Sequence, residues 1–496
     1  MTRTRICLCI LVLTPFFVYW QTVFHDYGFR DDYSHLRESR QEPGKLVKFT
    51  ASHGRPLYGA LLETSFLTAG ADGIDGLKWL RLTSVSLLTL LALALWRQLY
   101  QSGWTEIEAA VIGLGIVLLP AAQVTASWAV CWPHILALLL SVAGFSAIET
   151  ELERGGLKRV VALLGGGMIY CLAGLIYQSN ALFAVVPIAA VFLVRTGRDR
   201  LSDAKWLIIH LLTLLVGLAV SYLLVQMLFS SGIFHESPRM QFEAHPLTKL
   251  GWFFWQPLPN ALGLFSLRDD FNSWSPLFWS SVLIFTAIIG YGYKVARSGS
   301  DELARKKWLV CLIVMPVAAH AVSLAAAERA IGYRVIFGLS GMVLVLVVYT
   351  CRTLLAAGRI RPAVYYPTLG LFVLIGAIAA NHHAFTLIAE PQGNEWELVL
   401  SPVMRANFKG PTKVYLITPT PEDRSTAHVF ADEFGSLSTD SDWAPREMFN
   451  IAMQERFPGK KPNGFSYTVT LGRDPPEPNA YDMVIDLRKL RNFRVP

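Results

Sequence analysis

Long apolar segments recur along most of this 496-residue chain, and they constrain its fold more than any other feature. A helix needs roughly 20 apolar residues to cross the hydrocarbon core of a bilayer. Only 16% of the residues are charged, whereas about 25% is usual in soluble proteins. We therefore predict an all-α polytopic membrane protein with about 11 transmembrane helices. The predicted spans lie near residues 5–24, 79–97, 107–123, 129–148, 158–177, 180–195, 206–229, 277–294, 308–326, 333–352 and 364–385.

The distribution of basic residues predicts the orientation of these spans. Arg97, Arg154 and Lys158 belong to one set of alternating loops, whereas the short loops near 124–128 and 178–179 contain neither Lys nor Arg. Cytoplasmic loops of membrane proteins are enriched in Lys and Arg. We therefore expect a cytoplasmic N-terminus and an outside C-terminus. The net charge of +7 resides largely in these loops, so a nucleic-acid partner is not expected.

The outside segments divide the chain into a membrane core, residues 1–385, and a tail, residues 386–496. Two large outside loops, 25–78 and 230–276, belong to the core. Within the first loop, residues 57–67 are apolar but too short to span, which favours a helix at the membrane interface. The tail has three strand-like segments and one segment with helical apolar spacing; we expect a small outside α/β domain. These segments are 413–418, 466–470 and 482–487 for strands and 446–457 for the helix.

Two adjacent acids, Asp31 and Asp32, follow the first predicted span directly. Carboxylates beside a bilayer must stay hydrated or find partners. One functional interpretation is a general base that removes the proton of an acceptor hydroxyl as it attacks. The alternatives are a metal site or an N-cap, with Asp32 preceding a helix that starts at Tyr33. The residues alone leave these interpretations open.

Three arginines are candidates for binding a phosphate group. Arg55 lies in a Gly-Arg-Pro segment, and Arg329 and Arg334 lie at the outside end of a predicted span. The guanidinium group offers a planar fork of donors that suits phosphate oxygens. The alternatives are contacts with lipid headgroups or an internal ion pair, for example with Glu328.

Other polar residues of the outside segments are weaker candidates for substrate contacts. They are His53, Tyr33, Glu63, Arg268, Asp269 and His134. The chain has no Cys-x-x-Cys metal motif and no glycine-rich phosphate loop in its tail, so no cofactor is expected. A divalent metal held by Asp31 and Asp32 with Asp269 or Asp270 remains an open alternative.

The arrangement resembles a known superfamily. An acid pair just after the first span, the segment Gly54-Arg55-Pro56-Leu57, a short helix after it and an outside C-terminal domain are similar to the GT-C integral-membrane glycosyltransferases. More narrowly, the chain resembles the bacterial Gtr-type glucosyltransferases that modify O-antigen. The resemblance covers residues 1–385 in architecture, and its specific motifs lie within 26–58 and 327–334.

The resemblance implies an inverting glycosyltransferase that moves a hexosyl or pentosyl group from a polyprenyl-phosphate carrier. The acceptor would be a glycan, lipid or protein on the periplasmic face of a bacterial inner membrane. The general base would be Asp31, the first acid of the pair, or Asp32. Arg55, Arg329 and Arg334 would hold the lipid phosphate, and the aromatic residues 252–255 would help close the site beside the lipid chain. Many monosaccharide transferases of this class work without a metal, whereas the oligosaccharyltransferase branch needs one, so the resemblance leaves a metal open and implies no other cofactor.

Two other functional classes are compatible with many spans. A lipid-linked saccharide flippase or other transporter would place charges within the spans, but the middles of the predicted spans are nearly free of them. An O-antigen polymerase or ligase would be expected to use a large mid-chain loop with arginines rather than acids beside span one. The sugar, the linkage and the acceptor are not encoded in any residue spacing.

Overall fold

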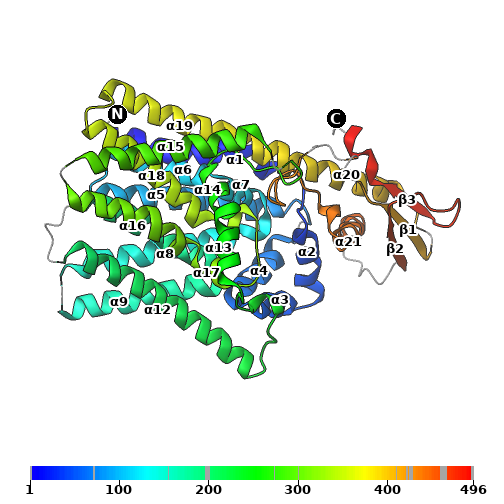
Figure 1. Cartoon of the computed structure of the whole chain (residues 1–496). Coiled ribbons are helices and arrows are strands. Elements are labelled where there is room, and N and C mark those ends of the chain that lie inside the picture. The colour runs from blue at the N-terminus through cyan, green and yellow to red at the C-terminus, as the bar shows by residue number, and fades with distance from the viewer. Residues whose placement is uncertain are drawn as a thin grey trace.

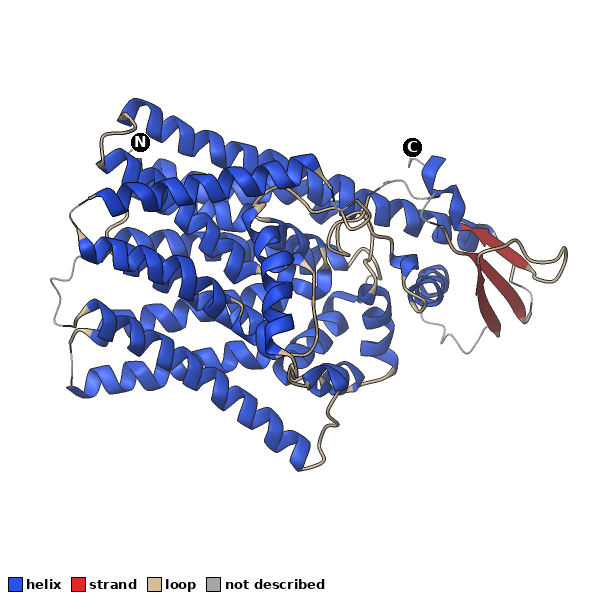
Figure 2. Cartoon of the chain, in the orientation of Figure 1, coloured by secondary structure: helices blue, strands red, loops and turns tan. Residues whose placement is uncertain are grey.

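The helices of the chain form one elongated bundle, and a small sheet lies beyond one end of it (Figures 1 and 2). The computed structural model describes residues 3–70, 73–154, 156–195, 201–272, 274–299, 301–408, 410–420, 423, 428–458 and 466–492.

Eight helices in the described residues are long and apolar enough to cross a membrane. This confirms the predicted polytopic, mainly helical fold. Their main segments are α1 (Arg3–Phe24), α5 (Leu77–Gln101), α8 (Trp132–Leu152), α9 (Gly156–Ile176), α12 (Asp203–Ser230), α15 (Pro276–Ser298), α18 (Phe337–Ala356) and α19 (Pro362–Ala384).

One further pair of helices is long and apolar enough to cross a membrane only when the two helices are taken together. α6 (Glu106–Leu118) and α7 (Pro120–Ser127) meet at an angle of 54°. The break falls at Leu119, which has an extended backbone, because Pro120 cannot continue the helical hydrogen bonding behind it.

Length and composition alone identify eight or nine of the roughly 11 predicted spans in the described helices. α10 (Gln178–Ala181), η3 (Leu182–Ala184) and α11 (Val185–Val194) form a helix of fewer than 18 residues. α16 (Glu302–Ala319) begins with four charged residues among its first six, so its apolar part is short. Both segments therefore fall short of the length or the apolar stretch that this count requires, although α16 exposes apolar side chains such as Ile313 (65%) on the surface of the bundle.

The last span continues far beyond its predicted end. α19, the π-helical segment η6 (Phe385–Ala389) and α20 (Glu390–Arg405) follow one another without a break. Together they form one 44-residue helix, Pro362–Arg405. The predicted division at residue 385 therefore lies inside a helix, which carries the chain from the bundle to the tail (Figure 1).

The tail forms the predicted α/β unit. Its three parallel strands are β1 (Thr412–Ile417), β2 (Tyr467–Gly472) and β3 (Met483–Asp486), in the order β2-β1-β3. The central strand buries Val414 and Leu416 completely. α21 (Ala444–Arg456) packs against α20 with its apolar face, as the spacing of Met448, Phe449 and Ala452 predicts.

The large loops gather at the end of the bundle that carries the tail, and the N-terminus lies at the other end (Figure 1). The turns after α5, α8 and α15 also lie at the N-terminal end, which separates the two predicted sets of loops. The helices of the loop end are α2 (Asp31–Gln41), α3 (Lys45–Ser52), α4 (Pro56–Ala69), α13 (Pro246–Trp255), α14 (Pro257–Leu262) and α17 (Ala321–Ala325).

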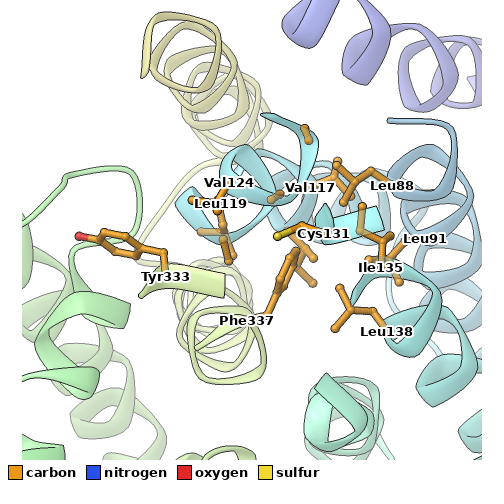
Figure 3. Packing of buried hydrophobic residues seen from close by; sticks show 14 of the residues in the cluster. Leu88, Leu91, Val117, Leu119, Val124, Cys131, Ile135, Leu138, Tyr333 and Phe337 are labelled. Atoms are coloured by element: carbon orange, nitrogen blue, oxygen red, sulfur yellow. The ribbon is translucent and has the colours of Figure 1, made fainter. Parts of the chain in front are cut away.

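A cluster of buried apolar side chains lies between the helices next to the loop end. Leu119, Val124, Cys131, Ile135 and Phe337 meet where the α6–α7 break faces α8 and α18 (Figure 3), and each is at most 1% exposed. The short helix η5 (Tyr333–Val335) packs on α7 directly above this cluster. The cluster therefore fixes the segment that carries one of the candidate arginines.

Candidate functional site

A cavity of about 850 Å³ lies at the loop end of the bundle. Its walls come from α10, α11, α12, α17, the turn 53–55 before α4, the segments 239–242 and 328–335, and three tail residues, 431–433. Five arginines line it: Arg30, Arg55, Arg239, Arg329 and Arg334. All three arginines predicted from the sequence therefore face one cavity.

The remaining wall is apolar and belongs mainly to α12. Leu211, Leu214, Leu218 and Val225 line the cavity from this helix. Leu215 also lines it and is 61% exposed, so the apolar wall continues onto the outer face of the bundle. The cavity thus combines a cationic end with an apolar side that reaches the lipid-facing surface.

Arg55 is positioned by a tight turn between α3 and α4. Gly54 has a φ of +75°, and a β-carbon there would lie 2.9 Å from the side chain of Met240 and 3.0 Å from Gln178; only glycine fits without a shift. The Arg55 guanidinium lies 4.1 Å from the Tyr177 ring centroid, and its Nε donates to Gln178 Oε1 at 3.4 Å. Among the described residues, no carboxylate forms an ion pair with Arg55.

Arg334 is held between an aromatic ring and an acid. Its guanidinium lies 4.4 Å from the Trp128 ring centroid. Its Nε lies 3.6 Å from Glu433 Oε1, and the Arg334 side chain remains 30% exposed toward the cavity. Glu433 is 4% exposed, and its Oε2 accepts the Tyr333 N–H at 2.6 Å. Burial raises the pKa of Glu433 to about 7, against the opposing effects of Arg334 and the Tyr333 N–H.

Arg329 and Arg239 lie at the rim. Arg329 is 47% exposed and 4.0 Å from Glu243, and Arg239 is 64% exposed and 3.7 Å from Glu328. Such exposed pairs are weak, so both guanidinium groups stay available to an anion. His53 also lines the cavity; its Nδ1 lies 2.7 Å from the Phe49 carbonyl, and burial lowers its pKa.

The two acids of the pair have different surroundings. Asp32 is completely buried: its Oδ2 accepts the Phe29 N–H at 2.9 Å and its Oδ1 accepts the Val130 N–H at 3.1 Å. Burial raises its pKa to about 7, although these N–H groups oppose the shift. Asp31 is partly exposed. Neither acid lines the cavity, whereas the preceding residue, Arg30, does.

The N-cap interpretation of Asp32 is wrong. α2 starts at Asp31, its N-cap is Arg30, and no side chain caps it. Asp32 instead reaches back to the loop before the helix and across to residue 130. It therefore fastens the first outside loop to the bundle.

Two candidates of the first loop make local contacts away from the cavity. Tyr33 is buried, and its hydroxyl accepts the Gly28 N–H at 3.3 Å. Glu63 Oε1 accepts the Gly44 N–H at 2.6 Å. Neither residue lines the cavity, so the structure does not bring them together with the arginines.

Three further candidates also lie outside the cavity wall. His134 is 2% exposed and packs behind Tyr177, with 3.9 Å between ring centroids. Arg268 donates from Nη1 to the Trp255 carbonyl at 2.7 Å. Asp269 Oδ1 accepts the N–H groups of residues 271 and 272. The aromatic segment 252–255 lies on α13, which packs against α17 and not in the cavity wall.

Tail residues 431–433 also line the cavity, which was not predicted from the sequence. Asp432 forms a bidentate ion pair with Arg30, with N–O distances of 2.9 and 3.0 Å. Asp270 accepts the N–H groups of Ala431 and Asp432 at 3.0 and 2.8 Å. These contacts bring Glu433 beside Arg334. No motif marks the segment 431–433, because its neighbours come from distant parts of the chain.

No group of three or more His, Cys, Asp or Glu in the described part of the chain is arranged to hold a metal ion. Asp269 accepts N–H groups of its own loop and pairs with His428. Asp270 accepts N–H groups of the tail, and Asp32 accepts those of Phe29 and Val130. The acids considered for a metal site are thus not gathered around one point.

No protein-family model and no curated protein matches the sequence. Among solved structures, the oligosaccharyltransferase AglB of Archaeoglobus fulgidus, in complex with an inhibitory peptide and a dolichol-phosphate, is 13% identical with a TM-score of 0.47. That match covers 91% of this chain and 64% of the other, so the chain spans less than two thirds of that protein. ArnT of Cupriavidus metallidurans, bound to undecaprenyl phosphate, is 10% identical with a TM-score of 0.44, over 90% of this chain and 84% of ArnT. At such TM-scores we draw nothing from either likeness.

Proposed function

We propose that the protein is an integral-membrane glycosyltransferase that takes its sugar from a polyprenyl-phosphate carrier. The single observation that carries the proposal is the composition of the cavity. Five arginines and three acids line it, and the rest of the wall is mainly apolar and continues onto the exposed surface of α12. A lipid phosphate has the same two parts, an anionic head and a long apolar chain.

The cationic end suits a phosphate whose charge grows during the reaction. When the bond between the sugar and the phosphate breaks, the leaving lipid phosphate gains negative charge. Among the described residues Arg55 has no carboxylate partner, and it lies against Tyr177, so its guanidinium needs little rearrangement to bind an anion. Fixed charges aimed at developing charge lower the barrier. Arg55 and Arg334 would provide most of this effect, with Arg329 and Arg239 at the entrance.

The acceptor hydroxyl would attack the anomeric carbon from the face opposite the phosphate, with inversion. Its proton would pass to a carboxylate of the first loop. Asp31 is the better candidate, because both oxygens of Asp32 already accept backbone N–H groups. Asp31 adjoins Arg30, which lines the cavity, so the acceptor would approach from the first-loop side.

The finer assignments are also proposals. Transfer of a hexosyl or pentosyl group, an acceptor in the O-antigen or another envelope glycan, lipid or protein, and an inner-membrane location with a periplasmic tail follow from the sequence resemblance. The separation of the basic loops from the cavity end is compatible with this orientation (Figure 1). No metal or other cofactor enters the proposed reaction.

The test is sugar transfer in membranes that contain the wild type, Asp31→Asn or Arg55→Ala at equal abundance. A panel of polyprenyl-phosphate sugars serves as donors, and release of polyprenyl phosphate is measured together with the glycosylated product. The proposal expects release by the wild type only. Movement of intact lipid-linked sugar across vesicles without release would favour a flippase, and formation of longer glycans from lipid-linked repeats would favour a polymerase or ligase.

A further inference from the structure

One buried carboxylate lies at the cationic end of the cavity, and it comes from the tail. Three acids line the cavity in the described residues: Glu328, Asp432 and Glu433. Glu328 and Asp432 are 41% and 63% exposed, whereas Glu433 is 4% exposed. Glu433 is thus the acid that water cannot stabilise.

Only one of the two carboxylate oxygens of Glu433 accepts a hydrogen bond in the described structure. Its Oε2 accepts the Tyr333 N–H at 2.6 Å. Its Oε1 has no hydrogen-bond donor and lies 3.6 Å from Arg334 Nε. A β-carbon on Gly332 would lie 2.5 Å from Oε1, so the backbone of segment 332–333 encloses this side of the carboxyl group. A buried carboxylate with one unpaired oxygen is costly.

Glu433 lies beside an arginine that a bound phosphate would need. The Arg334 guanidinium lies over Trp128, 4.4 Å from the ring centroid, and its Nε lies 3.6 Å from Glu433 Oε1. Glu433 therefore neutralises an arginine that the proposed donor requires. Two anions beside one guanidinium group repel each other.

We propose that ionised Glu433 is the counterion of Arg334, and that the donor phosphate binds beside Arg334 only after Glu433 has taken up a proton. This inference rests on the proposed function and deepens it. The proton comes from the solvent and is carried by Oε1. The neutral carboxyl group then donates a hydrogen bond from Oε1–H to a phosphate oxygen, while Oε2 keeps the Tyr333 N–H. No covalent bond other than this O–H forms or breaks.

Among the charged and titratable groups around Glu433, Glu433 is the buried acid that takes up a proton near neutral pH. The charged and titratable neighbours from all adjoining segments are Arg334, Arg30, Asp432, Tyr333 and Cys131. Arg30 and Asp432 are paired with each other and nearly cancel. Burial places the pKa of Glu433 at about 7, so the proton is available near neutral pH.

The experiment measures binding of farnesyl methyl phosphate to the purified full-length protein in detergent. This phosphodiester carries one charge that does not titrate near neutral pH, so any pH dependence belongs to the protein. Wild type, Glu433→Gln and Glu328→Gln are compared between about pH 5.5 and pH 8, and farnesol measures binding of the chain alone. Glu328→Gln removes the same charge from the rim and is the matched control.

The inference expects wild-type affinity to fall as the pH rises through the pKa of Glu433, by at most about tenfold per pH unit. Glu433→Gln should bind about tenfold more tightly than wild type at pH 8 and equally at pH 5.5. Glu328→Gln should keep the wild-type pH profile. Farnesol should bind all three proteins with no pH dependence.

Two results would overturn the inference. A flat wild-type profile would do so even if Glu433→Gln failed to fold, because it requires no variant. Equal pH profiles of wild type and Glu433→Gln would also overturn it, while leaving the donor cavity intact. Absence of phosphodiester binding by every protein at every pH would instead overturn the proposed function and this inference with it.

Discussion

Arg30 and Asp432 are 402 positions apart in the chain and form a bidentate ion pair at the mouth of the cavity. Both residues have positive φ, +46° and +58°, a region that non-glycine residues adopt only when their surroundings impose it. The pair joins the first outside loop to the tail, and it positions Glu433 next to Arg334.

Separate replacement of Arg30 and Asp432 by alanine should strengthen donor binding at pH 8, because either change loosens the tail and with it the ionised Glu433 beside Arg334. Asp432 is 63% exposed, so a coupling of at most about 1 kcal/mol is expected. A double-mutant cycle on the dissociation constant of farnesyl methyl phosphate measures it. Effects that simply add in the double variant would show that the two residues act independently.

Replacement of the two acids of the first loop should have different effects on activity and on folding. Asp31→Asn should lose most sugar transfer at unchanged abundance, since it removes only the proposed base. Asp32→Asn should reduce the amount of folded protein, because one amide N–H₂ would face the N–H of Phe29 or Val130. Transfer per folded molecule and fluorescence-detected gel filtration separate the outcomes. Full activity of Asp31→Asn would exclude it as the base.

Arg55→Ala and Arg334→Ala should each reduce donor affinity. A charge-assisted hydrogen bond contributes about 1.5–3 kcal/mol, which corresponds to roughly 10- to 100-fold in the dissociation constant. Arg55→Lys should restore little of the donor affinity, because a single ammonium group cannot replace the several donors of a guanidinium group that stacks on Tyr177. Arg154→Ala, at an exposed pair with Glu151, is the control. An equal loss in Arg154→Ala would mean that the measurement reports general damage.

The apolar wall can be tested on α12. Ala219 lines the cavity, whereas its neighbour Val220 does not. Ala219→Trp should fill the space of the lipid chain and raise the KM for long-chain donors severalfold, with a smaller effect on short-chain donors. Val220→Trp adds almost as much volume to the same helix and should leave both values unchanged. Equal effects of the two variants would place the chain elsewhere.

The sequence predicted the helical membrane core well because each span is a local property. Apolar runs of sufficient length identify α1, α5 and α12 without any knowledge of their neighbours. The segments 178–194 and α16 were predicted from the same local property, although their helices are too short or too charged at one end to be identified by length and composition alone. The strands of the tail were predicted for the same local reason, since alternation and β-branched residues mark β1 and β2.

The candidate site shows the limit of local reasoning. The sequence alone determined the cationic character of Arg55, Arg329 and Arg334, and the turn at Gly54 that presents the first of them. Only the tertiary structure decided that both carboxylate oxygens of Asp32 accept backbone N–H groups, from Phe29 and Val130. It also decided that Glu433 of the tail lies beside Arg334. Contacts between segments hundreds of residues apart depend on how the helices pack, and the identity of a single charged residue contains no information about that packing.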